Sequence, residues 1–314
     1  MRNRIISLIE ADAAQSEDIV FLTGDLGFSV VEPLQEMLGE RFVNVGVAEA
    51  NLVSISASLA AQGFMPFIYS IAPFVTARCY EQIRNDIVYQ KRAVRIIGVG
   101  SGFSYGSLGA SHHALEDANI MAALPGMIIG NPGNVAELDR FYAVAMQEEQ
   151  PAYFRIARES GAAWSVPFFS LDSGAYLARE GADATLIACG VSVTECLRAV
   201  ELLAAENISV RVVSVPVIAP FPSAALARLI GPGPIISVFE GFPGNPFSQG
   251  VMKTLYEGRF SNPYAELTVP HRFESIVGNT EALRARCGLD AASIANAMLR
   301  LVEGAAPQTC ERAA

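Results

Sequence analysis

Residues 42–77, FVNVGVAEANLVSISASLAAQGFMPFIYSIAPFVTA, combine two predicted strands and a predicted helix in one nearly uncharged stretch. The strands are expected at 42–45 and 65–70, and a glycine turn leads from the first strand into a helix rich in alanine and serine. Strand, helix and strand in this order are typical of a parallel sheet. Because the helix is small and apolar on every side, we expect it to lie buried.

Glu49 is the one charged side chain in this stretch, and it falls in the first turn of the predicted helix. The ordinary explanation is a carboxylate that touches solvent, since the helix dipole favours a negative charge there. Burying a lone carboxylate costs several kcal/mol unless a partner pairs with it, however, and this stretch contains no cation. We therefore predict that Glu49 is a buried acid without a partner in its own chain, which awaits a ligand.

The composition describes a well-packed globular protein. The 314 residues are enough for two domains, and 51% are hydrophobic while 17% are charged. A net charge of −10 argues against a nucleic acid partner, and no apolar run reaches the roughly 18 residues of a membrane helix. Three histidines leave little room for a protein metal site. Five scattered cysteines and the absence of a signal-peptide pattern lead us to expect a cytoplasmic protein.

Strand-like runs without polar alternation are separated by helical patterns along the whole chain. This pattern predicts an α/β fold with two parallel-sheet domains, each sheet covered on both faces. We place the first domain at 1–160, an irregular linker rich in Gly, Ser and Pro at 161–182, and a smaller second domain at 183–305. Residues 306–314 are expected to form a frayed tail.

Four segments follow the carboxyl ends of the strands in the first domain, at 24–27, 46–49, 70–74 and 98–113. Ligands of open parallel sheets bind beyond these strand ends. We therefore expect the four segments to converge on one edge of the sheet. There they would line a cleft with a buried glutamate, aromatic rings and histidines.

Several segments together resemble the transketolase family of thiamine diphosphate enzymes. They are FVNVGVAEANL, FIYSIAPFVTARCYEQIR and GSGFSYGSLGASHHALEDANIMAALPGM in the first domain, and PHRFESIVGNTEALRARCGLDAASI in the second. The similarity runs from about residue 21 to residue 303 and matches the pyrimidine-binding and C-terminal domains of the C-terminal subunit of a split transketolase. The resemblance implies a transferase that moves a two-carbon ketol or acyl unit from a ketone donor to an aldehyde or ketone acceptor.

The resemblance also assigns cofactor-binding residues. Glu49 matches the catalytic glutamate that makes a charge-assisted hydrogen bond to the aminopyrimidine ring of the cofactor. Phe74 matches the aromatic residue that stacks on this ring, with an ordinary core phenylalanine as the alternative. Ile71 stands where many family members have another aromatic residue. Asp25 completes the cofactor-binding candidates, but its Gly24-Asp25-Leu26 segment lacks the second glycine and the asparagine of a metal site, so we assign it no metal.

Four further residues are candidates for catalysis and substrate binding. His112 in GASHH matches the histidine that faces the reacting carbons as a hydrogen-bond donor or proton shuttle, with a surface histidine bound to backbone as the alternative. His113 replaces a family glutamine and is either a substrate contact or a neighbour without chemistry. Arg158 in PAYFRIAR matches the arginine that binds a substrate phosphate. Its alternative is a rim ion pair worth under about 1 kcal/mol.

Two substrate positions depart from the family pattern. Gly100 stands where related subunits have a histidine that contacts substrate, and Leu108 replaces a carboxylate that binds a sugar hydroxyl. A hydroxyl left unpaired beside Leu108 loses about 1–3 kcal/mol. We therefore expect a partner substrate that is less hydroxylated than xylulose 5-phosphate or ribose 5-phosphate.

The diphosphate and Mg²⁺ of the cofactor require a GDG…N segment with oxygen ligands, which this sequence does not contain. We therefore expect a second, diphosphate-binding chain, a heterotetramer, and an active site between the chains. One alternative is a synthase that uses a 2-oxo acid such as pyruvate, similar to deoxyxylulose-phosphate synthase or the 2-oxo acid dehydrogenases. Another is a regulatory or structural paralogue without catalysis, against which the buried Glu49 argues.

Overall fold

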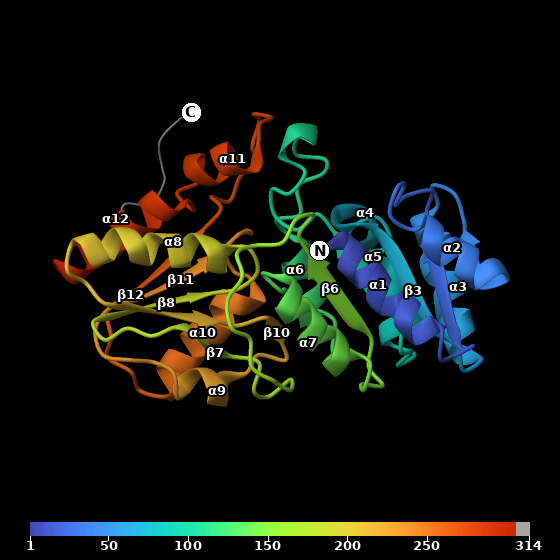
Figure 1. The fold of residues 1–314 in the computed structure, drawn as a ribbon, viewed down its shortest axis with the longest axis horizontal. Coiled ribbons are helices and arrows are strands. Elements are labelled where there is room, and N and C mark those ends of the chain that lie inside the picture. The colour runs from blue at the N-terminus through green and yellow to red at the C-terminus, as the bar shows by residue number, and fades with distance from the viewer. Residues whose placement is uncertain (306–314) are drawn as a thin grey trace.

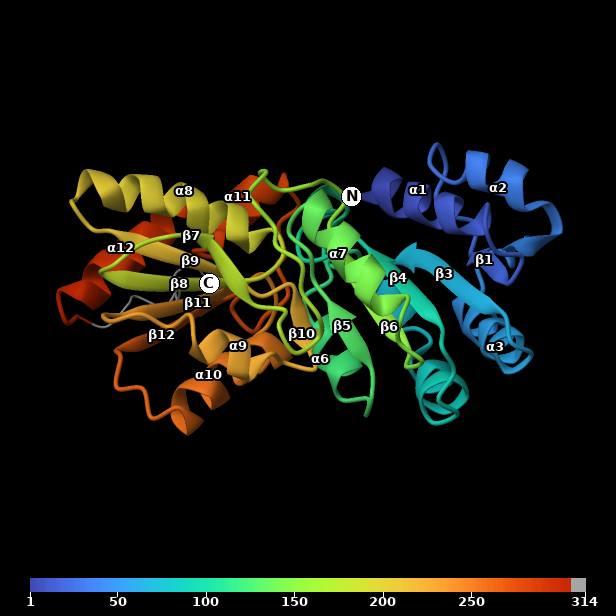
Figure 2. The ribbon, with the colours of Figure 1, turned by 60° about the horizontal axis from the view of Figure 1, so that its bottom comes forward.

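The computed structural model of the chain describes residues 1–305, which form two α/β units side by side (Figure 1). The predicted frayed tail, 306–314, lies outside the described residues. Each unit has one central sheet with helices on its two faces, as Figures 1 and 2 show. No helix within 1–305 is long and apolar enough to cross a membrane.

The first unit is built on a sheet of seven strands in the order β10–β5–β6–β4–β3–β1–β2. Its strands are β1 (Ile19–Thr23), β2 (Phe42–Asn44), β3 (Met65–Ile71), β4 (Arg95–Val99), β5 (Ile128–Gly130), β6 (Ala152–Ile156) and β10 (Val217–Ala219). Neighbouring strands run parallel, except that β10 pairs antiparallel with β5. The carboxyl ends of β1, β2, β3 and β4 therefore meet at one edge.

Helices cover both faces of this sheet. One face carries α1 (Arg2–Ala13), α2 (Glu32–Leu38) and α7 (Val135–Ala145); the other carries α3 (Glu49–Ala61), α4 (Ala72–Thr76), α5 (Tyr80–Gln82), the π-helical turn η2 (Ile83–Val88) and α6 (Asp117–Ala122). Two 3₁₀ turns, η1 (Gly39–Arg41) and η3 (Gly106–Leu108), lie in loops. Successive strand residues pack against opposite layers, as Phe21 and Leu22 do. The predicted α/β architecture is confirmed.

The second unit has a sheet of five strands in the order β12–β11–β8–β9–β7. Its strands are β7 (Tyr176–Arg179), β8 (Ala184–Ala188), β9 (Val210–Ser214), β11 (Ile235–Phe239) and β12 (Tyr264–Thr268). Its helices are α8 (Ser192–Ala205), α9 (Ser223–Ala227), α10 (Pro246–Glu257), α11 (Thr280–Arg286) and α12 (Ala291–Val302). In Figure 1, α8 and α12 lie above this sheet, and α9 and α10 lie below it.

Two segments differ from the sequence-based expectation. β7 forms inside the predicted linker 161–182 and pairs antiparallel with β9. The strand-like run 208–220 divides into β9 and β10, and β10 crosses to the first unit to pair with β5. Both β7 and β10 are edge strands, whose pairing depends on the strand that is offered to them more than on their own sequence pattern.

Helix α3 is less buried than its composition predicts. Leu52, Val53 and Ala57 are buried against the sheet, whereas Asn51 and Ser58 are exposed. The expectation of a helix buried on every side is therefore wrong for the isolated chain. The physical reason is position: α3 lies at the β1–β3 end of the sheet and contacts η2 as its main helical neighbour, so its outer side has no cover in this chain.

Candidate active site

The four loops at the carboxyl edge of the first sheet meet as expected. A Cβ atom on Gly24 would lie 3.1 Å from the carbonyl oxygen of Gly46 and 3.9 Å from Cγ of Glu49, so the first two loops touch. The third and fourth loops also touch, because the ring centroids of Phe74 and His112 are 5.1 Å apart. The edge therefore brings a glutamate, an aromatic ring and a histidine together.

Glu49 begins α3 and is buried, with 1% of its side chain exposed. Its Oε2 accepts a hydrogen bond from Nη1 of Arg78 at 2.7 Å. The guanidinium carbon of Arg78 lies 4.5 Å from the centroid of the Phe74 ring. The prediction that Glu49 has no partner in its own chain is therefore wrong. Its partner is the first residue beyond the uncharged stretch, brought back over Phe74 by the helical turn between them.

Ile71 and Asp25 lie at the ends of neighbouring strands. Ile71 directly precedes α4, the helix that carries Phe74. Asp25 is exposed in the loop after β1, where its backbone N–H donates to Oδ1 of Asn44 at 3.0 Å and its Oδ1 accepts from Nδ2 of Asn44 at 3.3 Å. Within residues 1–305, no group of three or more His, Cys, Asp and Glu side chains is arranged to hold a metal ion.

The two adjacent histidines face different surroundings. His112 is partly exposed beside Phe74, and its Nδ1 lies 3.0 Å from Oγ of Ser111. His113 is 3% exposed, and its ring meets that of Phe103 edge-on at a centroid distance of 5.1 Å. Neither ring nitrogen of His113 has a hydrogen-bond partner among the described residues. This burial is at odds with a substrate contact and agrees with the alternative, a neighbour without chemistry.

His113 should make the stability of the chain depend on pH. Burial lowers the pKa of its imidazole, whereas an unfolded histidine titrates near pH 6.5. Above about pH 6.5 both states are neutral, and below it the unfolded chain binds the proton first, so stability is lost as the pH falls. We expect the Tm of the wild type to fall more steeply between about pH 7 and about pH 5.5 than that of His113→Phe. His112→Phe serves as the matched control, and equal slopes for wild type and His113→Phe would contradict this prediction.

Arg158 and Gly100 lie on either side of Tyr105. Arg158 is exposed after β6, and its guanidinium carbon is 6.0 Å from the centroid of the Tyr105 ring. Gly100 follows β4, and a Cβ atom on it would lie 2.2 Å from Cε2 of Tyr105. The ring of His112 is 6.4 Å from that of Tyr105. Tyr105 thus stands between the candidate residues Arg158 and His112.

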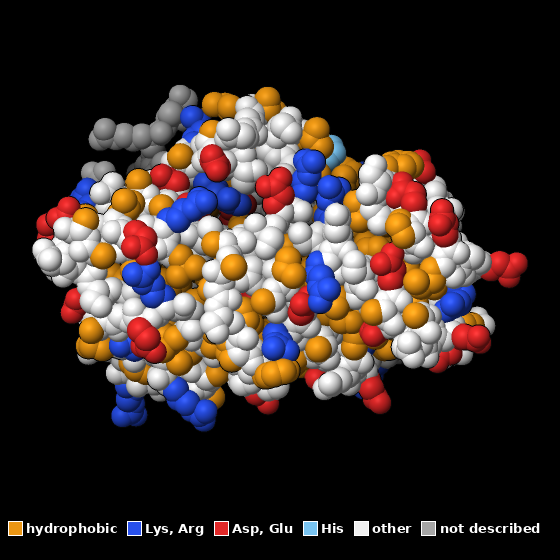
Figure 3. Space-filling view, viewed as in Figure 1, with side chains coloured by type: hydrophobic (Ala, Val, Ile, Leu, Met, Phe, Trp, Pro, Cys, Tyr) orange, Lys and Arg blue, Asp and Glu red, His pale blue; other side chains and the backbone are white. Residues whose placement is uncertain are grey.

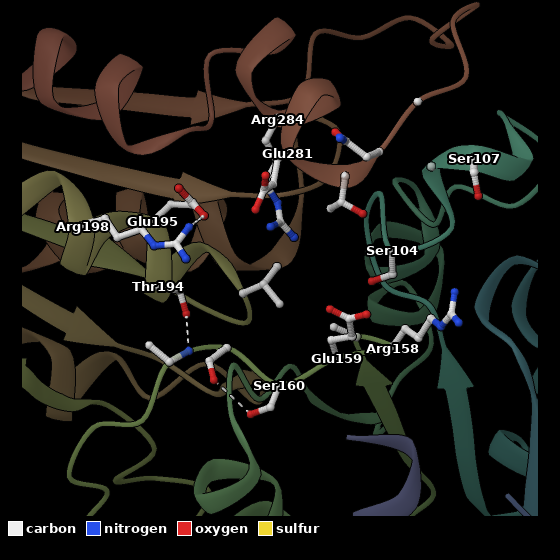
Figure 4. Close-up of a pocket in the computed structure, with 18 residues that line it drawn as sticks. Ser104, Ser107, Arg158, Glu159, Ser160, Thr194, Glu195, Arg198, Glu281 and Arg284 are labelled. Atoms are coloured by element: carbon white, nitrogen blue, oxygen red, sulfur yellow. Dashed lines mark hydrogen bonds and ion pairs between the residues drawn. The ribbon is translucent and has the colours of Figure 1, made fainter.

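A cavity of about 440 Å³ opens beside Arg158, between the two units. Figure 3 shows basic and acidic side chains gathered on this face, and Figure 4 shows Arg198 and Arg284 directed toward the cavity while Arg158 extends away from it. Its charged lining residues are Arg158, Arg198, Arg284, Glu159, Glu195 and Glu281. The two signs balance, and Glu49 and His112 do not line the cavity, so it is separate from the edge described above.

Two residues of this edge, Arg78 and Tyr105, were not predicted. For Arg78 the sequence does contain a signal, because Phe74 and Arg78 are four residues apart at a helix and such pairs lie on the same face. For Tyr105 we find none. It lies in the loop SGFSYGSLG, whose glycines and serines leave the direction of the chain open.

Comparison with known proteins establishes the family. Residues 1–162 match the family model of the transketolase pyrimidine binding domain, and residues 173–294 match that of the transketolase C-terminal domain. The chain belongs to the transketolase family. Enzymes of this family use thiamine diphosphate, and the resemblance inferred from the sequence segments is confirmed.

Individual relatives narrow the assignment to split transketolases. One of the two subunits of the apulose-4-phosphate transketolase of Phocaeicola vulgatus is 32% identical over 93% of this chain and 94% of that protein. A 6-deoxy-6-sulfo-D-fructose transketolase subunit of Clostridium sp. is 32% identical over 73% of this chain and 71% of that protein. The solved structure of a split-gene transketolase, described as an inactive beta4 tetramer, is 29% identical, with a TM-score of 0.85 over 96% of this chain and 98% of that one. The chain is therefore the C-terminal part of a split transketolase-like enzyme.

Proposed function

We propose that this chain supplies the pyrimidine-binding half of a transketolase active site and that a diphosphate-binding chain supplies the other half. The assembled enzyme transfers a two-carbon ketol unit from a ketone donor to an aldehyde acceptor. The observation that carries this proposal is the arrangement of Glu49 and Phe74, which hold one flat group between them at the carboxyl edge of the sheet.

Arg78 supports the fit of this site to the cofactor. A guanidinium is planar, donates N–H groups to carboxylates and stacks on aromatic faces. In this chain Arg78 does both, toward Glu49 and Phe74 respectively. An aminopyrimidine ring has the same two needs, a hydrogen-bond partner at its edge and an aromatic surface for its face. The residues present therefore fit the cofactor's pyrimidine, for which the half-exposed Arg78 side chain would turn outward.

Each candidate residue then has a role in the assembled site. Bound thiamine diphosphate supplies the carbon nucleophile and the electron sink of the reaction. Glu49 would hold the pyrimidine by a charge-assisted hydrogen bond, and Phe74 would stack on the ring. Ile71 and Asp25 would border the cofactor from the ends of their strands. His112 would donate or accept a proton at the reacting carbons.

The substrate end of the site points to an anionic compound. Arg158 is exposed and free to bind an oxyanion through two parallel hydrogen bonds. The substrates named for the two relatives carry a phosphate and a sulfo group, which agrees with an anionic end. Leu108 is 51% exposed on η3; covered by a partner chain, it would favour a substrate without a hydroxyl at that position.

Two features favour a partner chain. The outer side of α3 lacks cover, and Glu49 and His112 lie at an edge of the sheet rather than in the enclosed cavity. A partner that carries the diphosphate and Mg²⁺ ligands would close this edge. With two copies of each chain related by a two-fold axis, the assembly is a heterotetramer.

Co-expression with the diphosphate-binding chain of the same organism tests this proposal. Light scattering should show a heterotetramer, and ketol transfer from a ketose donor should require both chains, Mg²⁺ and thiamine diphosphate. Faster turnover of pyruvate than of any ketose would favour the synthase alternative. An intact complex without turnover would favour a paralogue that has lost catalysis, and full activity of this chain as a monomer would contradict the proposal outright.

A further inference from the structure

Tyr105 fills the space that a side chain at residue 100 would need. Gly100 has φ +94°, a conformation that side chains of L-residues rarely adopt. A Cβ atom there would lie 2.2 Å from Cε2 and 2.3 Å from Cδ2 of Tyr105. As long as the ring keeps this place, residue 100 can only be glycine. The missing histidine at this position and the presence of Tyr105 are thus parts of one arrangement.

The ring stands between the two ends of the proposed substrate site. The ring of His112 lies on one side at 6.4 Å, with an interplanar angle of 68°, and the guanidinium carbon of Arg158 lies 6.0 Å from the Tyr105 centroid. Tyr105 is partly exposed, and its hydroxyl is bonded to none of residues 1–305. The buried tyrosines differ in this respect, since Tyr153 and Tyr176 donate to carboxylates. The hydroxyl of Tyr105 is therefore available to a ligand.

The loop that carries Tyr105 is fixed from the second unit. The backbone N–H of Phe103 donates to Oε1 of Glu240 at 2.7 Å, and the carbonyl of Phe103 accepts from Oγ1 of Thr280 at 3.0 Å. The carbonyl of Gly106, on the other side of Tyr105, accepts from a backbone N–H at 3.3 Å. Because the backbone is held on both sides, the fold itself places the phenol, as a site that selects among substrates requires.

We propose that Tyr105 is a specificity-determining residue of the ketol transfer described above, on which this inference rests. Its hydroxyl binds one oxygen of the substrate, on a carbon between the reacting carbon at His112 and the anionic end at Arg158. A tyrosine hydroxyl both donates and accepts, so it suits a substrate hydroxyl or carbonyl. The substrate class is a hydroxycarbonyl compound with a terminal oxyanion and an oxygen opposite Tyr105.

Tyr105→Phe in the assembled complex tests this assignment, because it removes the hydroxyl and leaves the ring over Gly100. The kcat/KM for an acceptor with the hydroxyl should fall roughly tenfold or more, mainly through KM. The kcat/KM for the matching deoxy acceptor should stay unchanged. Tyr256→Phe, at a tyrosine that is 86% exposed on α10, is the matched control. Equal losses with both acceptors, or no loss with either, would overturn the assignment, whereas a wild-type complex without ketol transfer would overturn the proposed function.

The steric part of the inference has a test that needs no activity. Gly100→His should lower the Tm of the chain, because the imidazole collides with the ring of Tyr105. Gly100→His combined with Tyr105→Ala should recover part of this loss, since the ring is gone. A Gly100→His chain that is as stable as the wild type would contradict the coupling of the two positions.

Discussion

Glu49→Gln should slow the activation of thiamine diphosphate in the assembled enzyme by a factor on the order of 10² or more, the size of lost acid–base help. Glutamine keeps the shape of the side chain and removes its charge, so the bond to the pyrimidine becomes a neutral one. Hydrogen–deuterium exchange at C2 of the bound cofactor measures this step without substrate. Cofactor affinity, measured by calorimetry on the same complex, gives a second readout that does not depend on turnover.

The same substitution should leave the stability of the free chain nearly unchanged. The partner Arg78 is 47% exposed, and a pair with one such exposed member contributes about 1 kcal/mol or less. The amide oxygen of glutamine can still accept from Arg78, and the cost of burying a charge disappears. Glu32→Gln is the matched control, since Glu32 occupies the first turn of α2. Exchange at the wild-type rate in Glu49→Gln would show that Glu49 does not act on the cofactor.

The parts of the site that follow from local sequence could be predicted. Uninterrupted apolar runs identify β1, β3 and β4, and parallel pairing then places their loops at one edge. The position of Glu49 at a helix start follows from the glycine turn before it. These features depend on short stretches of chain, so the residues themselves carry enough information.

The parts that depend on distant partners could not be predicted. Glu137 accepts hydrogen bonds from Tyr176 and Ser214, which are 39 and 77 residues away, and no local pattern relates them. Burial raises the pKa of Glu137, a consequence of contacts that only the folded chain contains. The pairing of β10 with the first sheet and the place of Tyr105 are of the same kind.

Asp117→Ala should cost the chain about 3–5 kcal/mol of unfolding free energy, because it leaves a buried charge without its partner. Asp117 and Arg155 are 1% and 2% exposed. Nε of Arg155 donates to both carboxylate oxygens of Asp117, at 3.0 and 2.9 Å. Replacing both residues, as Asp117→Leu with Arg155→Met, should recover much of this loss, since well-packed apolar side chains often replace a buried ion pair without cost.

The loss should extend to the proposed catalytic loop and to the junction of the two units. Nη2 of Arg155 donates to the carbonyl of Ala114, next to His113, at 2.7 Å and to that of Glu240 in the second unit at 3.0 Å. Without Asp117 the guanidinium loses its anchor, so amide exchange in residues 100–115 should accelerate. Tyr153→Phe is the matched control, because it removes only a hydroxyl bonded to the same carboxylate and should cost about 1 kcal/mol. Urea unfolding measures both variants, and an Asp117→Ala chain no less stable than Tyr153→Phe would mean that the ion pair does not hold this junction.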